Sequence, residues 1–488
     1  MTSTPPRISL PHGPEIRRLI VGLWQMADQE RDGKPFDLDR AAEVLVGYAR
    51  AGFDSFDMAD HYGSAEIVAG MAHRALREAG ETPPTILTKW CPAPGAMGMD
   101  VVRKGVETAL ERLGLDRIDV MQFHWWQYAH PAWLDALENL MRLREEGLIG
   151  AIGLTNFDAA HLDLAAKSGI EIATNQVSAS VIDRRALGAM SEVAAAHGVG
   201  LLAYGSLLGG FLSGRYLGAE DPAEISDWSR MKYRRMIEAA GGWERFQAVM
   251  AALGGIARRH GVSLSNVASR WLLDQPAISA LIIGARLGES EHRADNLRVF
   301  DFALDAEDRA ALDAALAGLD PVPGDCGDEY RKPPFLTASG DLSHHLDSLP
   351  PVYPVTAAPA RPGRQRVESG SPWEAVAGYC RALRNGNRIL VSGTTATDPH
   401  GRCVGEGDAG AQAVYILDKI IAAITSLGGR AEDVIRTRIY LVDLDDCDAV
   451  CAAHARYFGE IRPANTLIGI AGLVGPYLVE IEAEAEIG

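Results

Sequence analysis

The stretch MDVVRKGVETALERLGLDRIDVMQFHWWQYAHPAWLDALENLMRLREEGLIGAIGL, residues 99–154, holds two successive helix–strand units. In its helix candidates, residues 99–114 and 131–147, apolar side chains recur at helical spacing, and the second candidate ends at a glycine, a common helix stop. Each candidate is followed by a short β-rich apolar run, at residues 118–124 and 149–154. Regular alternation of strand and helix predicts a parallel sheet covered by helices.

The same alternation extends through the first three hundred residues. Eight β-rich runs occur there, at residues 17–23, 53–60, 85–90, 118–124, 149–154, 172–177, 199–204 and 280–285. Eight strand–helix units in about three hundred residues favour a closed (β/α)8 TIM barrel over an open doubly wound sheet. An open sheet would also need a Gly-rich phosphate loop after its first strand, and residues 22–33, GLWQMADQERDG, contain no G-x-G-x-x-G. We therefore predict an α/β protein whose first domain is a (β/α)8 barrel.

A second, smaller domain is expected at the C-terminus. After a helix candidate at 304–319, with Asp305 as its N-cap, residues 321–372 are rich in Pro, Gly, Ser and Asp and lack a periodic apolar pattern. Strand and helix patterns then return in an order unlike the barrel repeat, which indicates a separate α+β domain. The predicted division is a barrel with a C-terminal tail over 1–346, a proline-rich linker over 347–368 and an α+β domain over 369–488.

Composition excludes several classes of protein. The chain has 488 residues with 47 Lys and Arg against 65 Asp and Glu, a formal charge of −18, so two or three domains are expected and nucleic acid is not the expected partner. No apolar run approaches the ~20 residues that span a bilayer, and the N-terminus lacks the apolar core of a signal peptide. Six cysteines scattered along a long chain suit a reducing compartment. We therefore expect a cytoplasmic protein that does not bind membranes.

No metal site is expected either. Cys447 and Cys451 are one helical turn apart but have no nearby partner ligands, and the adjacent side chains of His344 and His345 diverge without a third ligand.

Four polar side chains follow successive predicted strands and are expected to meet at one rim of the barrel. The second strand ends in Asp57, with Tyr62 five residues further on, Lys89 ends the third and His124 ends the fourth. A Lys beside a Tyr lowers the pKa of the phenol, so that the Tyr can protonate an oxygen as negative charge develops on it. A neutral His nearby can donate to the same oxygen. Any one such residue is more often structural than catalytic, but four complementary types on three successive strands favour carbonyl reduction with a hydride donor across the barrel mouth.

The segments that carry these residues resemble those of the aldo-keto reductase family. They are GFDSFDMADHYGSAE (52–66), TILTKW (85–90) and LERLGLDRIDVMQFH (110–124). The resemblance spans roughly residues 15–320 and implies an NAD(P)H-dependent oxidoreductase that acts on an aldehyde or ketone. By this resemblance Tyr62 would be the proton donor, tuned by Asp57 and Lys89. His124 would orient the substrate carbonyl.

Further segments resemble the family's nicotinamide-dinucleotide site, so the expected cofactor is NADP or NAD. They are GLTNF (153–157) and IIGARLGESEHRADN (282–296). By the resemblance, Thr155, Asn156 and Gln176 would hold the carboxamide, and the ring of Tyr204 would stack on the nicotinamide. The full implied set is Gly22, Trp24, Asp57, Thr155, Asn156, Gln176, Tyr204, Gly205, Ser206, Leu207, Gly284, Arg286, His292 and Asn296. Arg286 together with Arg293 favours the 2′-phosphate of NADP, since Arg binds phosphate oxygens bidentately.

The predicted substrate pocket is apolar, because several tryptophans fall at strand ends where their rings would form its walls. The residues expected to line it are Trp24, Tyr62, Trp90, His124, Trp125 and Trp126. Packing at the barrel rim is the alternative for the tryptophans. The tail at 324–346 either folds over the barrel mouth or wraps the surface.

The C-terminal domain resembles the RidA/YjgF family, which has a chorismate-mutase-like α+β fold and forms trimers. The segments RILVSGTTATDPHG, RTRIYLVDLDD and RPANTLIGIAGLVGPYLVEIEAEA carry this resemblance. It implies a pocket with Trp373, Asn465 and Glu480. Imine-deaminating members hold the substrate carboxylate with an Arg where this chain has Asn465, and an amide cannot supply that charged, bidentate contact. We therefore expect a domain that forms a homotrimer or higher oligomer or binds a ligand.

Three functions remain open from the sequence. The leading one is an NADPH-dependent carbonyl reductase whose C-terminal domain oligomerises or binds a ligand. In the second, the C-terminal domain hydrolyses an imine or enamine and the barrel reduces the product. In the third, the barrel is a cofactor-sensing binding protein with vestigial turnover. The expected partner is a small carbonyl compound.

Overall fold

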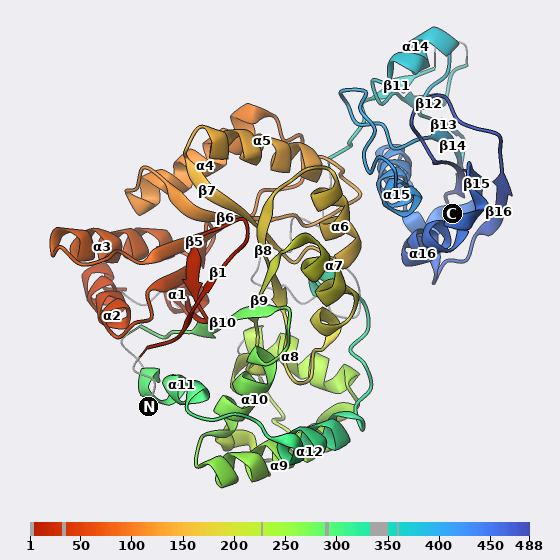
Figure 1. Cartoon of the computed structure of the whole chain (residues 1–488). Helices are drawn as coiled ribbons and strands as arrows, with labels where there is room; N and C mark the ends of the chain where they lie inside the picture. The colour runs from red at the N-terminus through yellow and green to blue at the C-terminus, as the bar shows by residue number, and fades with distance from the viewer. Residues whose placement is uncertain (1–3, 32–35, 226–227, 288–291, 332–349, 359–360) are drawn as a thin grey trace.

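The computed structural model describes residues 4–31, 36–225, 228–287, 292–331, 350–358 and 361–488. It contains a barrel and a smaller α+β unit that lies against one side of the barrel (Figure 1). Within the described ranges, no helix combines the length and the apolar character needed to cross a membrane.

Eight parallel strands close the barrel in the order β10, β3, β4, β5, β6, β7, β8, β9. Their bounds are β3 Leu19–Gly22, β4 Ser55–Ala59, β5 Thr85–Trp90, β6 Ile118–His124, β7 Ile149–Thr155, β8 Ile172–Ser178, β9 Gly200–Tyr204 and β10 Ile278–Gly284. Residues 281–284 of β10 pair with residues 19–22 of β3, which closes the cylinder. The predicted (β/α)8 barrel is confirmed, and each strand begins within two residues of its predicted start.

Helices cover the outside of the barrel because each of them turns an apolar stripe toward the strands. For example, α2 buries Leu45 and Tyr48, and the carboxylate of Asp37 caps its first turn. α12 begins at the predicted N-cap, Asp305, through a capping box with Asp308. The helices of this unit are α1 Trp24–Arg31, α2 Leu38–Arg50, α3 Ala65–Glu78, α4 Met99–Leu113, α5 Trp133–Glu145, α6 Ala159–Lys167, α7 Ala189–His197, α8 Trp228–Ala239, α9 Gly242–His260, α10 Leu264–Leu273, α11 Arg293–Leu297, α12 Ala306–Leu316 and α13 Asp328–Arg331.

A short hairpin, β1 Arg7–Ser9 and β2 Glu15–Arg17, covers the end of the barrel at which the strands begin. The hairpin side chains Leu10 and Ile16 form a buried cluster with strand residues Ile20, Leu87, Val120, Ala151, Ala173, Leu202 and Ala280. Because apolar side chains plug this end, the mouth of the barrel is the opposite end, where the strands finish.

The C-terminal unit is a seven-stranded sheet in the order β11, β12, β13, β14, β17, β15, β16. Neighbouring strands are antiparallel except for β15 and β16, which run parallel. The elements are β11 Val355–Ala357, β12 Arg364–Val367, α14 Pro372–Ala377, β13 Ala382–Asn385, β14 Arg388–Thr394, α15 Ala409–Ser426, β15 Val434–Leu441, α16 Cys447–Phe458, β16 Ala464–Gly469 and β17 Val479–Glu486. The predicted α+β domain is confirmed.

The predicted linker over 347–368 is wrong in its second half. Residues 355–357 and 364–367 form β11 and β12, which extend the C-terminal sheet beyond β13. All three residues of β11 are exposed. This edge strand therefore needs no alternation of apolar and polar residues, and no such pattern marks it in the sequence. Residues 332–349, which include the predicted boundary between tail and linker, lie outside the described residues.

The two units share a buried contact between α15 and α6 of the barrel. His161 of α6 contacts Asp158 through Nδ1 at 2.8 Å and Asp418 of α15 through Nε2 at 3.0 Å. Arg456 of α16 contacts Asp158 at 2.6 Å and Asp325 at 2.9 Å. At this contact each unit therefore supplies charged groups that pair with charged groups of the other unit.

Candidate active site

A cavity of about 660 Å³ opens at the mouth of the barrel. Asp57, Tyr62, Lys89 and His124 all line it. They come from β4, from the turn that follows β4, from β5 and from β6, which are neighbours in the barrel. The structure thus brings the four predicted residues together at one rim, because the carboxyl ends of parallel strands meet there.

Asp57 is the anchor of this group. Its carboxylate accepts hydrogen bonds from Lys89 Nζ at 2.7 and 2.9 Å and from the side-chain amides of Gln122 at 2.9 Å and Gln176 at 2.7 Å. Asp57 and Lys89 are both buried. Lys89 Nζ lies 4.8 Å from the centroid of the Tyr62 ring. A positive charge is therefore held beside the phenol, where it favours the phenolate form.

Aromatic side chains set the orientation of Tyr62 and His124. The ring of Trp24 meets the ring of Tyr62 edge-on, with centroids 4.9 Å apart. Trp126 packs on His124 at 4.4 Å, and the Cys91 Sγ atom lies 3.7 Å from His124 Nδ1. Burial raises the pKa of the Cys91 thiol to about 12, so the thiol stays neutral. A neutral neighbour adds no charge that would keep the imidazole protonated.

Thr155, Asn156 and Gln176 lie side by side at the ends of β7 and β8. The Thr155 hydroxyl is buried and has no hydrogen-bond partner among the described residues. Asn156 adopts a left-handed backbone conformation, φ 57°, which Asn tolerates better than most residues. Buried polar groups are nearly always paired, so the Thr155 hydroxyl fits an amide group of a bound molecule, such as the carboxamide of nicotinamide.

Tyr204 is fixed through its hydroxyl. The hydroxyl donates to Asn156 Oδ1 and contacts Glu329 Oε1, each at 2.8 Å. Glu329 in turn pairs with Arg185 at 3.0 Å. Burial raises the pKa of Tyr204 well above its usual value, and the Glu329 carboxylate adds to this. The phenol therefore stays neutral, and its ring lines the cavity.

Glu329 belongs to the tail whose path the sequence left open. In the described part of the tail, Tyr330 lines the cavity at the mouth, and Arg331 donates to the backbone oxygens of Trp125 and Asn156 at 2.7 Å each. Up to residue 331 the tail therefore folds over the barrel mouth. Its remainder, with His344 and His345, lies outside the described residues.

The other residues expected at the cofactor also line the cavity: Gly22, Trp24, Gly205, Ser206, Leu207, Gly284, Arg286, His292 and Asn296. At Gly205, φ is 67° and a Cβ atom would lie 2.4 Å from the Tyr233 hydroxyl, so only glycine fits. Arg293, which was expected to favour the 2′-phosphate together with Arg286, does not line the cavity. It donates to the backbone oxygen of Gly47 at 2.6 Å and lies over the ring of Tyr48 at 4.9 Å, which holds it on α2.

Three basic residues of the cavity had escaped sequence reasoning. Arg215, Arg230 and Lys232 line it from the long connection between β9 and β10. Lys232 Nζ donates to the Tyr330 hydroxyl at 3.0 Å and lies 5.0 Å from the centroid of the Tyr204 ring. With Arg286 these residues give the cavity a positive lining that suits phosphate groups. Arg230 and Lys232 lie on α8 and Arg215 in a single helical turn, and no local signal in the sequence shows that these positions face the cavity.

Three of the tryptophans predicted in the substrate pocket lie outside the cavity. Trp90 packs on α4, where a Cβ at Gly105 would approach its ring nitrogen to 2.4 Å. Trp125 is fully buried and donates its indole N–H to backbone oxygens of its own loop, and Trp126 is fully buried against His124. The alternative, packing at the barrel rim, is correct for these three because each ring fills space behind the strand ends.

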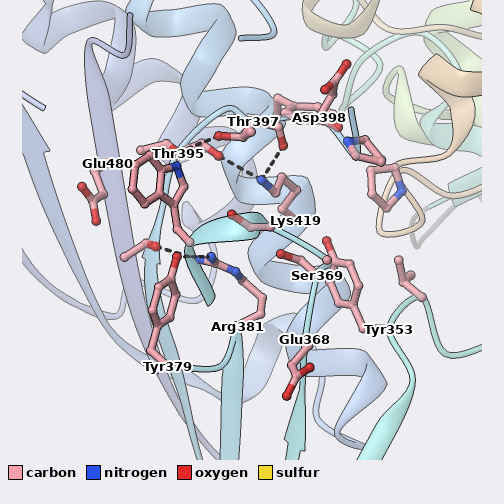
Figure 2. A pocket seen from close by; sticks show the side chains of 18 of the residues that line it. Tyr353, Glu368, Ser369, Tyr379, Arg381, Thr395, Thr397, Asp398, Lys419 and Glu480 are labelled. Carbon is pink, nitrogen blue, oxygen red and sulfur yellow. Dashed lines mark hydrogen bonds between the residues drawn. The ribbon is translucent and has the colours of Figure 1, made fainter. Parts of the chain in front are cut away.

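A second cavity, of about 840 Å³, lies between the C-terminal unit and the barrel (Figure 2). Trp373 and Glu480 line it as expected. Asn465 does not, because it lies on β16, which β15 separates from β17 and Glu480. Its side-chain amide donates to Thr437 Oγ1 at 2.9 Å. Within one chain these three residues do not meet, and a pocket that groups them at an interface between copies of the chain stays a prediction.

Comparison with known proteins follows the two units. A model described as the aldo/keto reductase family matches residues 18–317, and one described as Endoribonuclease L-PSP matches residues 370–487. An aldo-keto reductase of Mycobacterium sp. (strain MCS) is 26% identical, with 64% of this chain and 91% of the relative covered. An uncharacterized protein of Streptomyces coelicolor is 41% identical, with 25% of this chain and 92% of the relative covered. The crystal structure of a YjgF/YER057c/UK114 family member from Mycobacterium tuberculosis is 38% identical, covers 26% of this chain and 100% of that chain, and has a TM-score of 0.24.

Proposed function

The chain belongs to the aldo/keto reductase family, and from this premise we propose that it reduces an aldehyde or ketone with NADPH, with Tyr62 as the proton donor. Membership implies an oxidoreductase that acts on carbonyl groups. The observation that carries the finer proposal is the placement of Lys89 Nζ, which Asp57 holds 4.8 Å from the Tyr62 ring inside the cavity.

In the proposed reaction the nicotinamide, when bound, supplies a hydride to the carbonyl carbon. Negative charge develops on the carbonyl oxygen, and the Tyr62 hydroxyl donates its proton there. Lys89 stabilises the phenolate that remains, and Asp57 keeps Lys89 charged and in place. The imidazole of His124 lines the same cavity and would donate a hydrogen bond to the same oxygen, which fixes the direction of the carbonyl.

The lining of the cavity supports a nicotinamide dinucleotide. The buried Thr155 hydroxyl and the amides of Asn156 and Gln176 would hold the carboxamide, and the ring of Tyr204 would lie against the nicotinamide. Arg286, with the basic residues opposite it along the cavity, supports NADP over NAD, because guanidinium groups bind a 2′-phosphate bidentately.

Turnover is a better proposal than cofactor sensing alone. A sensor needs only the residues that hold the dinucleotide, whereas this cavity also contains the four groups that transfer and stabilise a proton. Imine hydrolysis by the C-terminal unit gains no support from the single chain, because Asn465, at the position where imine-deaminating members carry Arg, lies apart from Trp373 and Glu480.

We also propose that the chain forms homotrimers or higher oligomers through its C-terminal unit. Large apolar side chains at least a third exposed are concentrated there: Val355, Trp373, Val376, Tyr379, Leu390, Ile435, Leu444, Ile468 and Val474. In the described part of the barrel the corresponding residues are Ile67, Val101 and Leu217. Contiguous exposed apolar surface is typical of protein–protein contacts.

The variant Tyr62→Phe tests the proposed reduction. It removes the phenolic proton and keeps the ring that packs on Trp24. We expect kcat for NADPH-dependent reduction of a panel of aldehydes and ketones to fall by about 10²- to 10⁴-fold. The Kd for NADPH, measured by quenching of protein fluorescence, should change little, and NADPH should give a higher kcat/KM than NADH.

Tyr48→Phe is the matched control, since Tyr48 is buried on α2 outside the cavity. Its kcat should equal that of the parent chain. Full activity of Tyr62→Phe would exclude Tyr62 as the proton donor. A parent chain that binds NADPH but oxidises it only once would favour the sensor.

A further inference from the structure

The cavity between the two units has no part in the proposed reduction. Both units form its walls: Ala96, His130, Pro131, Ala132 and Asp135 belong to the barrel, and the other lining residues lie between 352 and 480. Of the residues that the structure describes, none lines both this cavity and the one at the barrel mouth. It is therefore a separate candidate site.

The amine of Lys419 is the reactive group of this cavity. Lys419 lies on α15, is 7% exposed, and donates from Nζ to the backbone oxygens of Thr395 at 3.0 Å and Thr397 at 2.7 Å (Figure 2). Among the described residues, no carboxylate forms an ion pair with it. A neutral amine has two N–H groups, which these two acceptors match, whereas an ammonium has three. The arrangement therefore suits the neutral form, whose lone pair remains available.

Burial lowers the pKa of Lys419 to about 7, and the positive charge of Arg381 lowers it further. The carboxylates of Glu374 and Asp398 act in the opposite direction, but each already has a cationic partner, Arg381 and Arg402 respectively. At pH 7 about half of the Lys419 amines are then neutral, against roughly one in three thousand for an ordinary lysine.

A proton source lies on the barrel side of the same cavity. Asp135, on α5, has its pKa raised to about 6 by burial and by the nearby Glu138 carboxylate. A carboxyl group with this pKa gives up and takes back a proton near neutral pH. His130, beside it in the lining, has its pKa lowered to about 4 by burial and is neutral at pH 7.

The rest of the lining combines aromatic side chains (Tyr353, Trp373, Tyr379 and Tyr415) with ionisable ones (Glu368, Arg381, Asp398 and Glu480). The ring of Tyr415 lies 5.7 Å from Lys419 Nζ, and Tyr353 and Ala132 line the same cavity. Burial raises the pKa of Tyr353 to about 13, so its phenol stays neutral. The aromatic rings can contact the apolar body of a bound aldehyde or ketone, and the Lys419 amine is the nucleophile for its carbonyl carbon.

We propose that the cavity between the two units binds a small aldehyde or ketone and that Lys419 captures it covalently as an imine. This goes beyond the proposed reduction, since it uses different residues, a different cavity and no nicotinamide.

The proposed step is balanced without an oxidant or reductant. The lone pair of Lys419 Nζ forms a bond to the carbonyl carbon, the carbon–oxygen π pair moves to oxygen, and one N–H proton is transferred to give a neutral carbinolamine. The Asp135 carboxyl protonates the hydroxyl group, which leaves as water while the nitrogen lone pair forms the C=N bond. The nitrogen then returns its last proton to Asp135. The net change is one amine and one carbonyl converted to one imine and one water, and it is reversible.

Reductive trapping on the full chain tests this proposal. The protein is incubated with benzaldehyde and sodium cyanoborohydride and without nicotinamide, so that the barrel cannot reduce the aldehyde. An imine is then fixed as a benzylated lysine, which peptide mapping by mass spectrometry locates among the seven lysines of the chain. At pH 7 we expect Lys419 to be modified about two to three orders of magnitude faster than Lys104, an exposed residue of α4.

Two variants test whether the modification depends on the side chains of Lys419 and Asp135. Lys419→Arg should abolish the modification at this position, and Asp135→Asn should slow it at Lys419 by at least about tenfold while the labelling of Lys104 stays the same. The far-ultraviolet circular dichroism of both variants is compared with that of the parent chain. The labelling rate of the unmutated chain tests the proposal even if a variant fails to fold. The proposal would be overturned if Lys419 were modified no faster than Lys104 and if its modification rate rose only toward pH 10.

Discussion

The hydroxyl group of Thr155 should contribute to the affinity for the cofactor. The Thr155 hydroxyl is buried at the barrel mouth without a partner among the described residues, which costs about 1–3 kcal/mol unless a ligand supplies one. We therefore expect Thr155→Val, which keeps the shape of the side chain, to raise the Kd for NADPH by roughly 3- to 10-fold, as for the loss of one hydrogen bond.

Thr174→Val is the matched control for this measurement. The Thr174 hydroxyl is also buried and unpartnered within the described residues, but it lies beside Gly153 inside the barrel and does not line the cavity. Fluorescence titration should give an unchanged Kd for Thr174→Val. Equal effects of the two substitutions would show that the Thr155 hydroxyl does not contact the cofactor.

The residues of the barrel mouth differ in how far the sequence could predict them. Asp57, Lys89 and His124 lie within two residues of the ends of their strands, so the alternation of strands and helices already places them at one rim. Arg215 lies in a single helical turn and Lys232 on α8, both in the connection between β9 and β10, and packing rather than a local pattern decides that they reach the cavity. Sequence reasoning found the first group and missed the second for this reason.

The helix α15 shows the same difference for a secondary-structure element. Its apolar composition predicts a helix, and a helix apolar on nearly all sides is expected to be buried on both faces. Only the structure shows what covers each face: the C-terminal sheet on one and α6 of the barrel on the other. The two neighbouring charges Asp418 and Lys419 thereby enter different environments, one in the contact with the barrel and one in the cavity.

The contact between α15 and α6 should weaken as the pH rises. Burial would lower the pKa of His161, but the carboxylates of Asp158 and Asp418 raise it above its usual value near 6.5. A raised pKa means that the stabilisation is complete below about pH 6.5 and is lost as the pH rises through the raised value. Arg456, which also contacts Asp158, keeps its charge throughout this range.

Calorimetric unfolding between pH 6 and 9 measures this effect. We expect the stability of the C-terminal unit to fall with a slope of at most about 1.4 kcal/mol per pH unit, and His161→Gln should remove this slope. His197→Gln is the control, because His197 pairs with Asp163 in a partly exposed position and makes no ion pair with Asp158 or Asp418 among the described residues. A slope that persists in His161→Gln would assign it to other groups.

Across the molecule, the two units present different surfaces to solvent. Leu390 of β14 is exposed while its neighbours Ile389 and Val391 are buried. On β16, Ile468 is also exposed, and it pairs with Tyr440 of β15. Side chains two residues apart on a strand share a face, so Leu390 and Ile468 lie on the face of the sheet opposite α15. The same face also carries Tyr440 and the ion pairs of Arg438 with Glu482 and Glu484. This mixed face is the proposed contact between copies of the chain.

Light scattering coupled to size-exclusion chromatography tests that contact. The parent chain should have a mass of three or more copies, and Ile468→Glu should shift it toward one copy, because a carboxylate cannot be buried there without a partner. Ile67→Glu, at an exposed position of α3 on the barrel, should leave the mass unchanged. A monomeric parent chain at tens of micromolar would contradict the proposed assembly.

The amino-acid order alone determined the barrel, the α+β unit, the strand-end residues Asp57, Lys89 and His124, and the two family resemblances. These follow from periodicity and from short segments, which are local properties of the chain. Tertiary structure decided the rest. It moved Trp90 and Arg293 away from the cavity, added Arg215 and the other basic residues, and turned part of the predicted linker into an edge of the sheet. It also placed Lys419 in a cavity with walls from both units. Burial, charge environment and pKa depend on which distant segments pack together, and no local pattern in the sequence records that packing.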